Sequence, residues 1–119
     1  MAYDEGLAHR VRELLEDHPG YDEKKMFGGL CFLLGGNMAV GVTGEDLMVR
    51  VGKQGHDEAM AQPHARPMDF TRKQMTGFVY VAPEGTAEDD ALQAWVDRGA
   101  AHAESLPPKQ PHHPTPAVQ

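Results

Sequence analysis

Residues 26–51, MFGGLCFLLGGNMAVGVTGEDLMVRV, contain three short apolar runs separated by glycine turns. The runs are rich in Val, Leu, Phe and Met, and the turns read Gly-Gly, Gly-Gly-Asn and Gly-Glu-Asp. Apolar runs of strand length between such turns are typical of antiparallel strands joined by hairpins, and no helix of ordinary length fits between the breakers. The stretch therefore predicts a β-meander. It contains no residue pattern that identifies a reaction.

The first two predicted strands differ in how they meet the core. Residues 30–34 are apolar at every position, so we expect this strand to be covered on both faces, with Cys31 as a packing residue. In the next strand, alternation predicts that Met38, Val40 and Val42 share one face. The small residues between them leave room on the other face for a closely packed helix or a partner.

Further along the chain, the pattern predicts two more strands and a short helix. In the third strand, residues 47–51, alternation places Met48 and Arg50 on the face opposite the core. A fourth strand is predicted over residues 78–81 and a short helix over residues 53–61. Two segments with little periodicity are expected to be connections, namely 21–25 and 63–74.

Two amphipathic helices flank the strands. Asp4 is a suitable N-cap for the first, whose apolar residues recur at helical spacing as far as Leu15. The second begins near Thr86 and Asp89, which resemble a capping box, and we expect its Trp95 to be a main anchor of the core.

These elements predict a two-layer α+β fold, in which an antiparallel β-meander sheet carries an N-terminal and a C-terminal helix. We expect one domain over residues 1–106 and a disordered tail over residues 107–119, because five prolines and two adjacent histidines in that segment oppose regular structure.

The composition favours a soluble protein of the cytoplasm. The chain has 119 residues, one cysteine and a formal net charge of −7 at pH 7. One cysteine forms no internal disulfide, the start MAYDEGLAHR is unlike a signal peptide, and no apolar run approaches the roughly 18 residues of a membrane helix. The negative charge opposes the approach to phosphates, so we expect no direct DNA binding.

The charge is unevenly distributed. Residues 47–81 carry five bases against three acids, whereas the rest of the chain carries six bases against fifteen acids. A solvated mixed surface explains this distribution, and the alternative is a polar interface. We select six cations as a candidate surface for a partner or ligand, namely Lys24, Lys25, Arg50, Arg66, Arg72 and Lys73.

The sequence contains no motif for a metal, a cofactor or catalysis. The double glycines fit neither a phosphate-binding loop nor a dinucleotide fingerprint, and the histidines have no ligand spacing. No basic residue adjoins Cys31 to lower its pKa, and no general acid and base are paired. We therefore expect no metal site, no cofactor and no enzymatic activity.

The ordered motifs resemble one protein family. They are a helix, Lys-Lys-Met-Phe-Gly-Gly-Leu at 24–30, Gly-Gly-Asn-Met at 35–38, Leu-Met-Val-Arg-Val at 47–51, Gly-Phe-Val-Tyr-Val at 77–81 and a Leu-x-x-Trp-Val helix. This order, over residues 3–106, resembles the N-terminal domain of the TfoX/Sxy family standing alone, without the C-terminal domain in which DNA contacts are expected. Full-length members are bacterial regulators of natural competence, described as acting with the cyclic-AMP receptor protein at promoters. The resemblance implies an antiparallel sheet with packed helices and a non-catalytic binding role.

Two functions are left open. The first is a regulatory or adaptor domain that binds a protein partner, a second copy included, through the sheet surface around Arg50 and residues 63–76. The alternative is a binder of a small anionic ligand, or an enzyme of unknown reaction, that uses Arg50, Arg66 or Lys73 to hold carboxylates or phosphates. We favour the first, because an enzyme would need a general acid and base pair.

Overall fold

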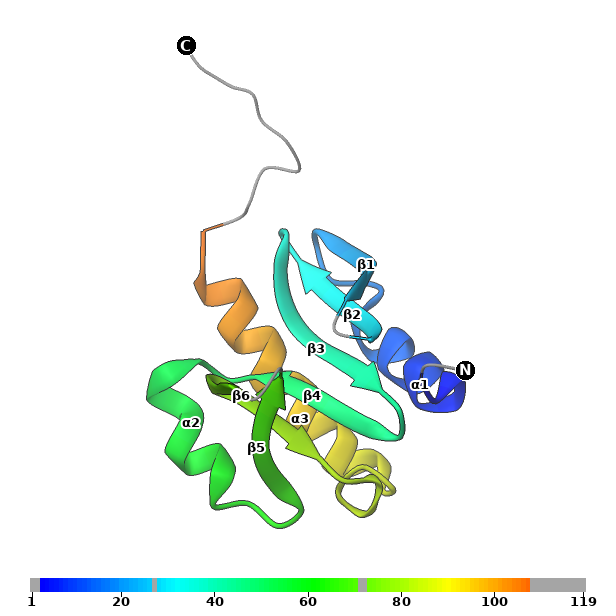
Figure 1. Ribbon diagram of the computed structural model, residues 1–119. Helices are drawn as coiled ribbons and strands as arrows, with labels where there is room; N and C mark the ends of the chain where they lie inside the picture. The colour runs from blue at the N-terminus through cyan, green and yellow to red at the C-terminus, as the bar shows by residue number, and fades with distance from the viewer. Residues whose placement is uncertain (1–2, 27, 71–72, 108–119) are drawn as a thin grey trace.

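A six-stranded antiparallel sheet forms the centre of the protein (Figure 1). The computed structural model describes residues 3–26, 28–70 and 73–107. In chain order the elements are α1 (Glu5–Leu15), β1 (Tyr21–Met26), β2 (Gly29–Leu34), β3 (Asn37–Thr43), β4 (Asp46–Arg50), α2 (Gly52–Met60), β5 (Ala65–Phe70), β6 (Lys73–Val81), the 3-10 helix η1 (Pro83–Gly85) and α3 (Asp89–Ser105). The strand order is β1-β2-β3-β4-β6-β5, so β2 to β4 form the predicted meander. The predicted α+β fold is confirmed.

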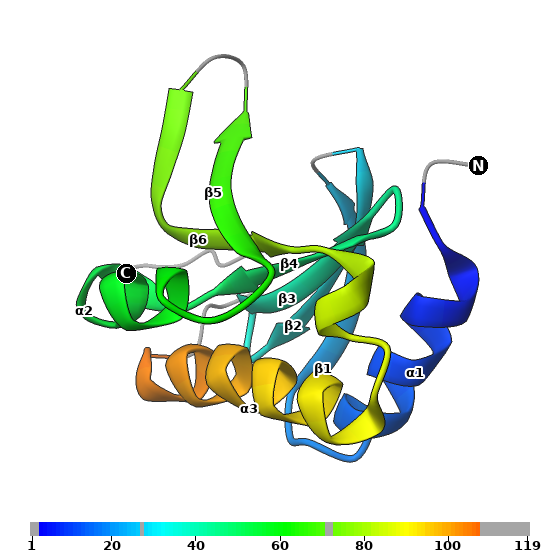
Figure 2. The same cartoon turned by 90° about the horizontal axis from the view of Figure 1, so that it is seen from below.

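Helices α1 and α3 pack on the same face of the sheet, and the hairpin of β5 and β6 rises from the opposite face (Figure 2). The core between helices and sheet is built from apolar residues of both layers, chiefly Leu7, Val11, Leu15, Phe32, Val40, Val42, Leu47, Val49, Val79, Leu92, Trp95 and Val96. Trp95 is 6% exposed, which confirms it as a core residue. None of the described helices is long and apolar enough to cross a membrane.

A β-bulge at Ala39 changes the phase of β3. Phe32 pairs with Val40 and Leu33 with Met38, so Ala39 is an extra residue without an opposite partner. The prediction that Met38 shares a face with Val40 is therefore wrong. Met38 packs on the helix-free side of the sheet, whereas Ala39 and Val40 belong to the core under the helices.

The bulge is also the place where α3 comes closest to the sheet. A Cβ added at Gly99 would lie 2.3 Å from the carbonyl oxygen of Ala39 and 2.7 Å from Cγ1 of Val40. Only a glycine in α3 and a small residue in β3 permit this contact between two backbones. Ala39 is one of the small residues that were predicted to leave room for a closely packed helix, and it does so for α3.

Two strands that the sequence pattern missed form the edges of the sheet. Residues 21–25, predicted to be a connection, lie in β1, and most of residues 63–74, predicted to be irregular, lie in β5 and β6. Both edge strands carry charged residues, and β5 contains Pro67, which is tolerated at an edge because the outer N–H groups have no partner strand. Because these edge strands carry charged residues and a proline, their sequences lack the apolar alternation that identifies an inner strand.

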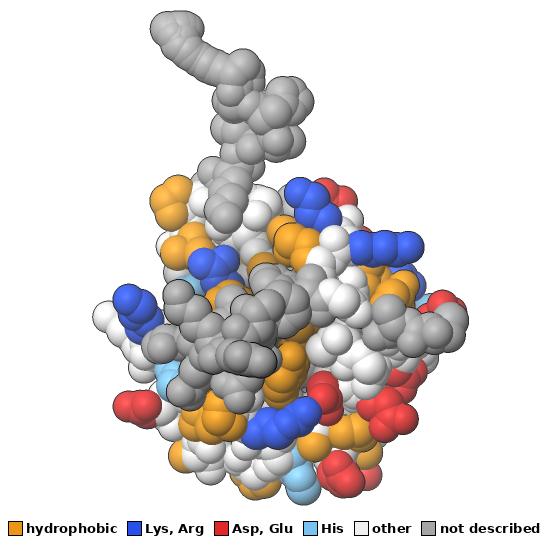
Figure 3. Space-filling model, viewed as in Figure 1, with side chains coloured by type: hydrophobic (Ala, Val, Ile, Leu, Met, Phe, Trp, Pro, Cys, Tyr) orange, Lys and Arg blue, Asp and Glu red, His pale blue; other side chains and the backbone are white. Residues whose placement is uncertain are grey.

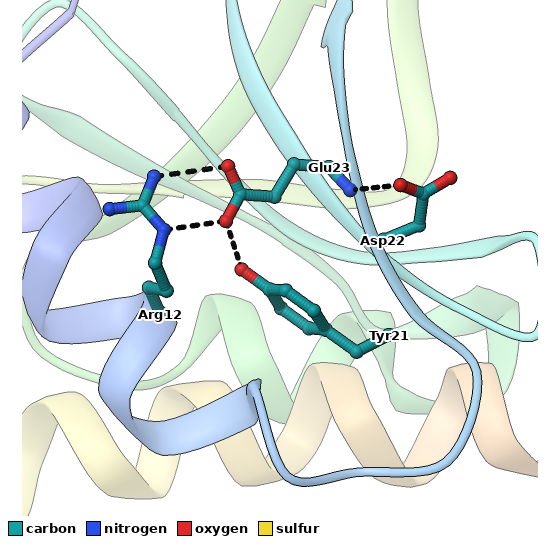
Figure 4. A network of polar contacts seen from close by, with 4 residues as sticks. All are labelled: Arg12, Tyr21, Asp22 and Glu23. Atoms are coloured by element: carbon teal, nitrogen blue, oxygen red, sulfur yellow. Dashed lines mark hydrogen bonds and ion pairs between the residues drawn. The ribbon is translucent and has the colours of Figure 1, made fainter.

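A network of polar contacts joins α1 to the edge strand β1 (Figure 4). Arg12 donates from Nε and Nη2 to the two carboxylate oxygens of Glu23, at 2.6 and 3.0 Å, and the hydroxyl of Tyr21 donates to the same carboxylate. The hydrogen bond from Arg12 lowers the pKa of Glu23 and outweighs the opposite effect of burial. The network therefore stabilises the ionised carboxylate and holds α1 beside the sheet.

The N-terminal cap of α1 is the one that the sequence predicts, whereas the cap of α3 is not. Asp4 caps α1 by accepting from the N–H groups of Gly6 and Leu7, at 2.9 and 3.1 Å. The capping box predicted at Thr86 is absent, because Glu88 is the N-cap residue and the Thr86 hydroxyl donates instead to the carbonyl of Pro83. Thr86 is buried, and its hydroxyl bonds to the preceding 3-10 turn instead of capping α3.

The predicted tail begins where the description of the chain ends. Residues 108–119 lie outside the described residues, so the expectation of disorder for them remains a prediction. Pro107 is described, and its carbonyl accepts a hydrogen bond of 3.0 Å from the side-chain amide of Asn37, a buried residue at the start of β3.

Substituting Gly99 and Gly55 by alanine is expected to change stability in opposite directions. Gly99→Ala places a methyl group against the carbonyl of Ala39, and we expect it to lower the free energy of unfolding by about 1 to 3 kcal/mol despite the higher helix propensity of alanine. Gly55→Ala, in α2, adds a methyl group 3.6 Å from Cβ of Val51 and is expected to raise it by about 0.5 to 1 kcal/mol. Denaturant unfolding of both variants measures the two signs. A stabilised Gly99→Ala protein would show that α3 does not sit this close to β3.

Glu23→Gln is expected to lower the free energy of unfolding at pH 7 by about 1 kcal/mol, a modest value because the Glu23 side chain is 26% exposed and solvent screens the pair. A lowered pKa in the folded state stabilises the protein above the unfolded pKa of about 4.3. The difference from wild type should therefore disappear as the pH falls from about 4.3 through the folded pKa. Urea unfolding between about pH 2 and pH 7 measures it. Glu16→Gln, at the exposed C-cap position that follows α1, is the control, and an equal loss there would contradict the assignment.

Candidate functional site

The face of the sheet opposite α1 and α3 carries a continuous row of side chains from edge to edge. Paired residues of neighbouring antiparallel strands project to the same side. The register links one residue of each strand, in the order Lys24, Cys31, Gly41, Met48, Tyr80 and Arg66. The row has a cation at each edge and apolar residues between them. We call this side of the sheet the helix-free face.

The centre of the helix-free face is a small buried cluster of Cys31, Met38 and Met48. A Cβ on Gly41 would lie 2.7 Å from Cε of Met48, so the methionine occupies the space that a larger residue would fill. Burial raises the pKa of Cys31 to about 11, which agrees with its predicted role in packing. Three partly exposed residues pack around this cluster, namely Met26, Phe78 and Tyr80.

Two arginines lie over the two aromatic rings of this face. Cζ of Arg50 is 5.8 Å from the ring centroid of Phe78, and Cζ of Arg66 is 4.9 Å from that of Tyr80. Arg66 also forms an ion pair of 2.6 Å from Nη2 to Oδ2 of Asp46. The hydrogen bond to this carboxylate raises the pKa of Arg66. Each ring is thus covered in part by a guanidinium group, at a distance that allows a cation–π interaction.

Figure 3 shows this side of the molecule. Lys and Arg side chains lie around its rim with hydrophobic side chains among them, and most of the acidic side chains visible in this view gather at its lower right (Figure 3). The rim of the helix-free face therefore carries charges of both signs (Figure 3).

The six cations selected from the sequence do not form one surface. Lys24, Arg50 and Arg66 lie on the helix-free face, which the register shows. Lys25 follows Lys24 in a strand and therefore projects to the side of α1, as Glu23 does. Arg72 and the side chain of Lys73 lie outside the described part of the chain, so their place in this surface remains a prediction.

The sequence interpretation did not select Phe78, Tyr80 and Met26. The signal for the first two was present, because alternation in Gly-Phe-Val-Tyr-Val puts Phe78 and Tyr80 opposite Val79 and Val81, which face the core. Met26 begins the stretch that predicts the meander, but the face to which it projects was not predictable because β1 was not predicted to be a strand.

Arg50 also influences a second cluster, at the junction of β4 and α2. Gly52 has φ +79°, and atom Cε1 of His102 lies 2.5 Å from the position that a Cβ on Gly52 would take. Burial, and to a lesser degree the positive charge of Arg50, lowers the pKa of His102. Nδ1 of His56 accepts a hydrogen bond of 3.2 Å from the N–H of Gly77. His56 thus binds the backbone of β6 at Gly77, and His102 of α3 packs against Gly52 at the start of α2.

The titratable side chains of the described residues do not gather in a metal-binding cluster. Among them there is no group of three or more His, Cys, Asp or Glu side chains that would hold a metal ion. A shallow depression of about 270 Å³, lined by Tyr3, Asp4, Gly44 and Glu45, contains Asp4, whose carboxylate is committed to capping α1. What the helix-free face offers is an apolar surface with oriented positive charges.

Cys31 is expected to react with an aromatic disulfide reagent only when the protein unfolds. Its exposure is 0%, and with a pKa of about 11 the reactive thiolate is about one part in a thousand at pH 8. Absorbance of the released thiolate measures the rate in buffer and in denaturant, with Cys31→Ala as the blank. Rapid labelling in buffer would show that the centre of the helix-free face is open.

The comparison with protein families gives one result. The family model of the TfoX N-terminal domain matches residues 13–103, which include the end of α1, all six strands, α2 and most of α3. A search of curated proteins and a search of solved structures each gave no match. The matched region covers most of the chain, and the chain therefore belongs to the TfoX N-terminal domain family.

Proposed function

We propose that this protein is a non-catalytic regulatory or adaptor domain that binds a protein partner on the helix-free face. The observation that supports this most directly is the pair of arginine–aromatic stacks, Arg50 on Phe78 and Arg66 on Tyr80, which lie partly exposed on a face that no described helix covers.

The residue types on this face are those that contribute most to binding between proteins. Tyrosine and arginine are enriched at the few interface positions that carry most of the binding energy, and methionine and phenylalanine are enriched at interfaces in general. Phe78 and Tyr80 rest on the buried methionines below them, so their rings are held in place before a partner arrives. A pre-oriented ring loses little conformational entropy on binding, which favours affinity.

The alternative, a binder of a small anion or an enzyme, has less support. Arg66 already holds the carboxylate of Asp46, which leaves Arg50 as the cation of this pair without such a partner among the described residues. One half-buried arginine on an open sheet does not enclose a small ligand, because such sites are concave and bury most of the ligand. The net charge of −7 opposes direct DNA binding, so we propose that any regulatory effect passes through a protein.

Capture from an extract of the native cells tests the proposal. The immobilised wild-type chain is compared with the double variant Phe78→Ala, Tyr80→Ala and with the control His9→Ala, Glu13→Ala on the exposed side of α1. We expect at least one partner to be captured in stoichiometric amount by the wild type and the control, and to be lost with the first variant, because the rings supply the apolar contact. Thermal unfolding confirms that the variants are folded. Equal capture by all three proteins would contradict a binding role for the helix-free face.

A further inference from the structure

Gly77 lies where the pairing of β6 with its neighbours changes. Its carbonyl accepts a hydrogen bond of 2.8 Å from the N–H of Val51, directly after β4. On the other side the pairing is irregular, because β5 advances by two residues between Pro67 and Asp69 where β6 advances by five. In the described register Gly77 has no partner residue in β5. Its φ of +91° is a backbone conformation that glycine adopts without strain.

His56 of α2 supplies the acceptor for the N–H of Gly77. The hydrogen bond runs from this N–H to Nδ1 of the imidazole, at 3.2 Å. A backbone N–H is only a donor, so Nδ1 must carry a lone pair and no proton. Protonation of the ring converts Nδ1 into a donor and breaks the bond. This link between α2 and β6 thus exists only with a neutral imidazole.

A second imidazole, that of His102 in α3, lies against the start of α2. Its Cε1 and Nδ1 atoms are 2.5 and 2.7 Å from the position that a Cβ on Gly52 would take, so the ring rests directly on the backbone. Gly52 in turn approaches Gly77, where an added Cβ would lie 3.2 Å from the carbonyl carbon of Gly52. The two rings therefore contact two glycines that are themselves in close approach.

The environment of His102 disfavours a positive charge. Burial of the ring and, to a lesser degree, the charge of Arg50 lower the pKa of His102. A pKa that is lowered in the folded state stabilises the protein above the unfolded pKa of about 6.5, and this contribution is lost as the pH falls below that value and through the folded pKa. The window lies above that of Glu23, which begins near about pH 4.3.

Neither ring would gain an ion pair on protonation. His9 of α1 shows the opposite arrangement, since its Nε2 lies 3.3 Å from the carboxylate of Glu13. Among the described residues, no carboxylate is at ion-pair distance from His56 or His102. A proton on either ring therefore adds charge without adding an attractive partner.

The acids on the surrounding elements are paired with other groups or exposed. Glu58 pairs with Arg98 at 3.6 Å and Glu104 with His18 at 2.9 Å. Asp57 is exposed, where water and salt screen its charge. The charged side chains described on these elements are Lys53, Asp57 and Glu58 of α2, Arg50 of β4, Arg66 of β5, and Arg98 and Glu104 of α3.

We propose that His56 and His102 form a pH-sensitive lock between β6 and the start of α2, closed by the neutral rings and opened by their protonation. Phe78 follows Gly77 directly and carries one of the two aromatic rings on the helix-free face. Opening of the lock therefore loosens the backbone that positions this ring. The inference goes beyond the proposed function and does not rest on it, so either can fail without the other.

The variant His56→Asn separates the hydrogen bond from the charge. Its side-chain oxygen can replace Nδ1 as the acceptor for the N–H of Gly77, but an amide takes up no proton in this pH range. Urea unfolding between about pH 8 and pH 5, where imidazoles change charge, measures the unfolding equilibrium constant. Over this range we expect the constant to increase about two- to ten-fold more in wild type than in His56→Asn, the size expected for one lost hydrogen bond.

Two further measurements assign the effect to the lock. His102→Gln should also reduce the pH dependence, because it removes the second ring that gains a charge. Amide hydrogen exchange, corrected for its intrinsic dependence on pH, reports on the link itself. Protection of the Gly77 amide should fall on acidification in wild type and stay constant in His56→Asn, while protection of Val40, in the inner strand β3, should change in neither protein.

The matched control is His9→Asn, the same substitution at an exposed histidine of α1. It should leave both the extra pH dependence and the change at Gly77 as they are in wild type. An equal pH dependence in wild type and either lock variant, or an equal loss of it in His9→Asn, would overturn the proposal. Constant protection of Gly77 in wild type would also overturn it, and this measurement decides alone if a variant fails to fold.

Discussion

The close contact between α3 and the bulge of β3 determines how the two faces of the sheet are used. Because Gly99 has no side chain, α3 lies directly on the carbonyl of Ala39 and covers the middle of the sheet. The bulge that makes this contact also turns Met38 to the other side, where it completes the cluster with Cys31 and Met48. One irregularity thus closes the core under the helices and provides the apolar base of the opposite face.

The inner strands were predictable because their own sequences contain apolar residues at the positions that are buried. Residues 30–34 are apolar on both sides, and β2 is an inner strand with both faces buried. The edge strands were not predictable in this way, since β1 reads Tyr-Asp-Glu-Lys-Lys-Met and is stabilised by contacts far away in sequence, such as the pair of Glu23 with Arg12 of α1. The bulge was missed for a related reason. Alternation assumes an unbroken strand, and one extra residue at Ala39 changes which face Met38 shares with Val40 and Val42.

The candidate surface was predictable in composition but not in arrangement. The sequence interpretation selected cations that are close in sequence, and Lys24 and Lys25 prove to project to opposite sides of one strand. Arg50 and Arg66 come to the same face because β6 lies between β4 and β5, and this order is set by pairing over long sequence distances. The aromatic rings of β6 that orient both arginines enter the site by the same pairing.

The core and the candidate surface share residues, and this limits how freely the surface can change. Met48 fills the space above Gly41, and Phe78 and Tyr80 pack on the cluster that contains it. A substitution at either ring therefore removes core contacts as well as exposed apolar area. The charged rim is different, since Lys24 and Arg50 contribute little to packing at their exposed ends. A substitution at the rim consequently changes the charge of the face with little loss of packing, whereas a substitution at either ring also removes contacts with the methionines below it.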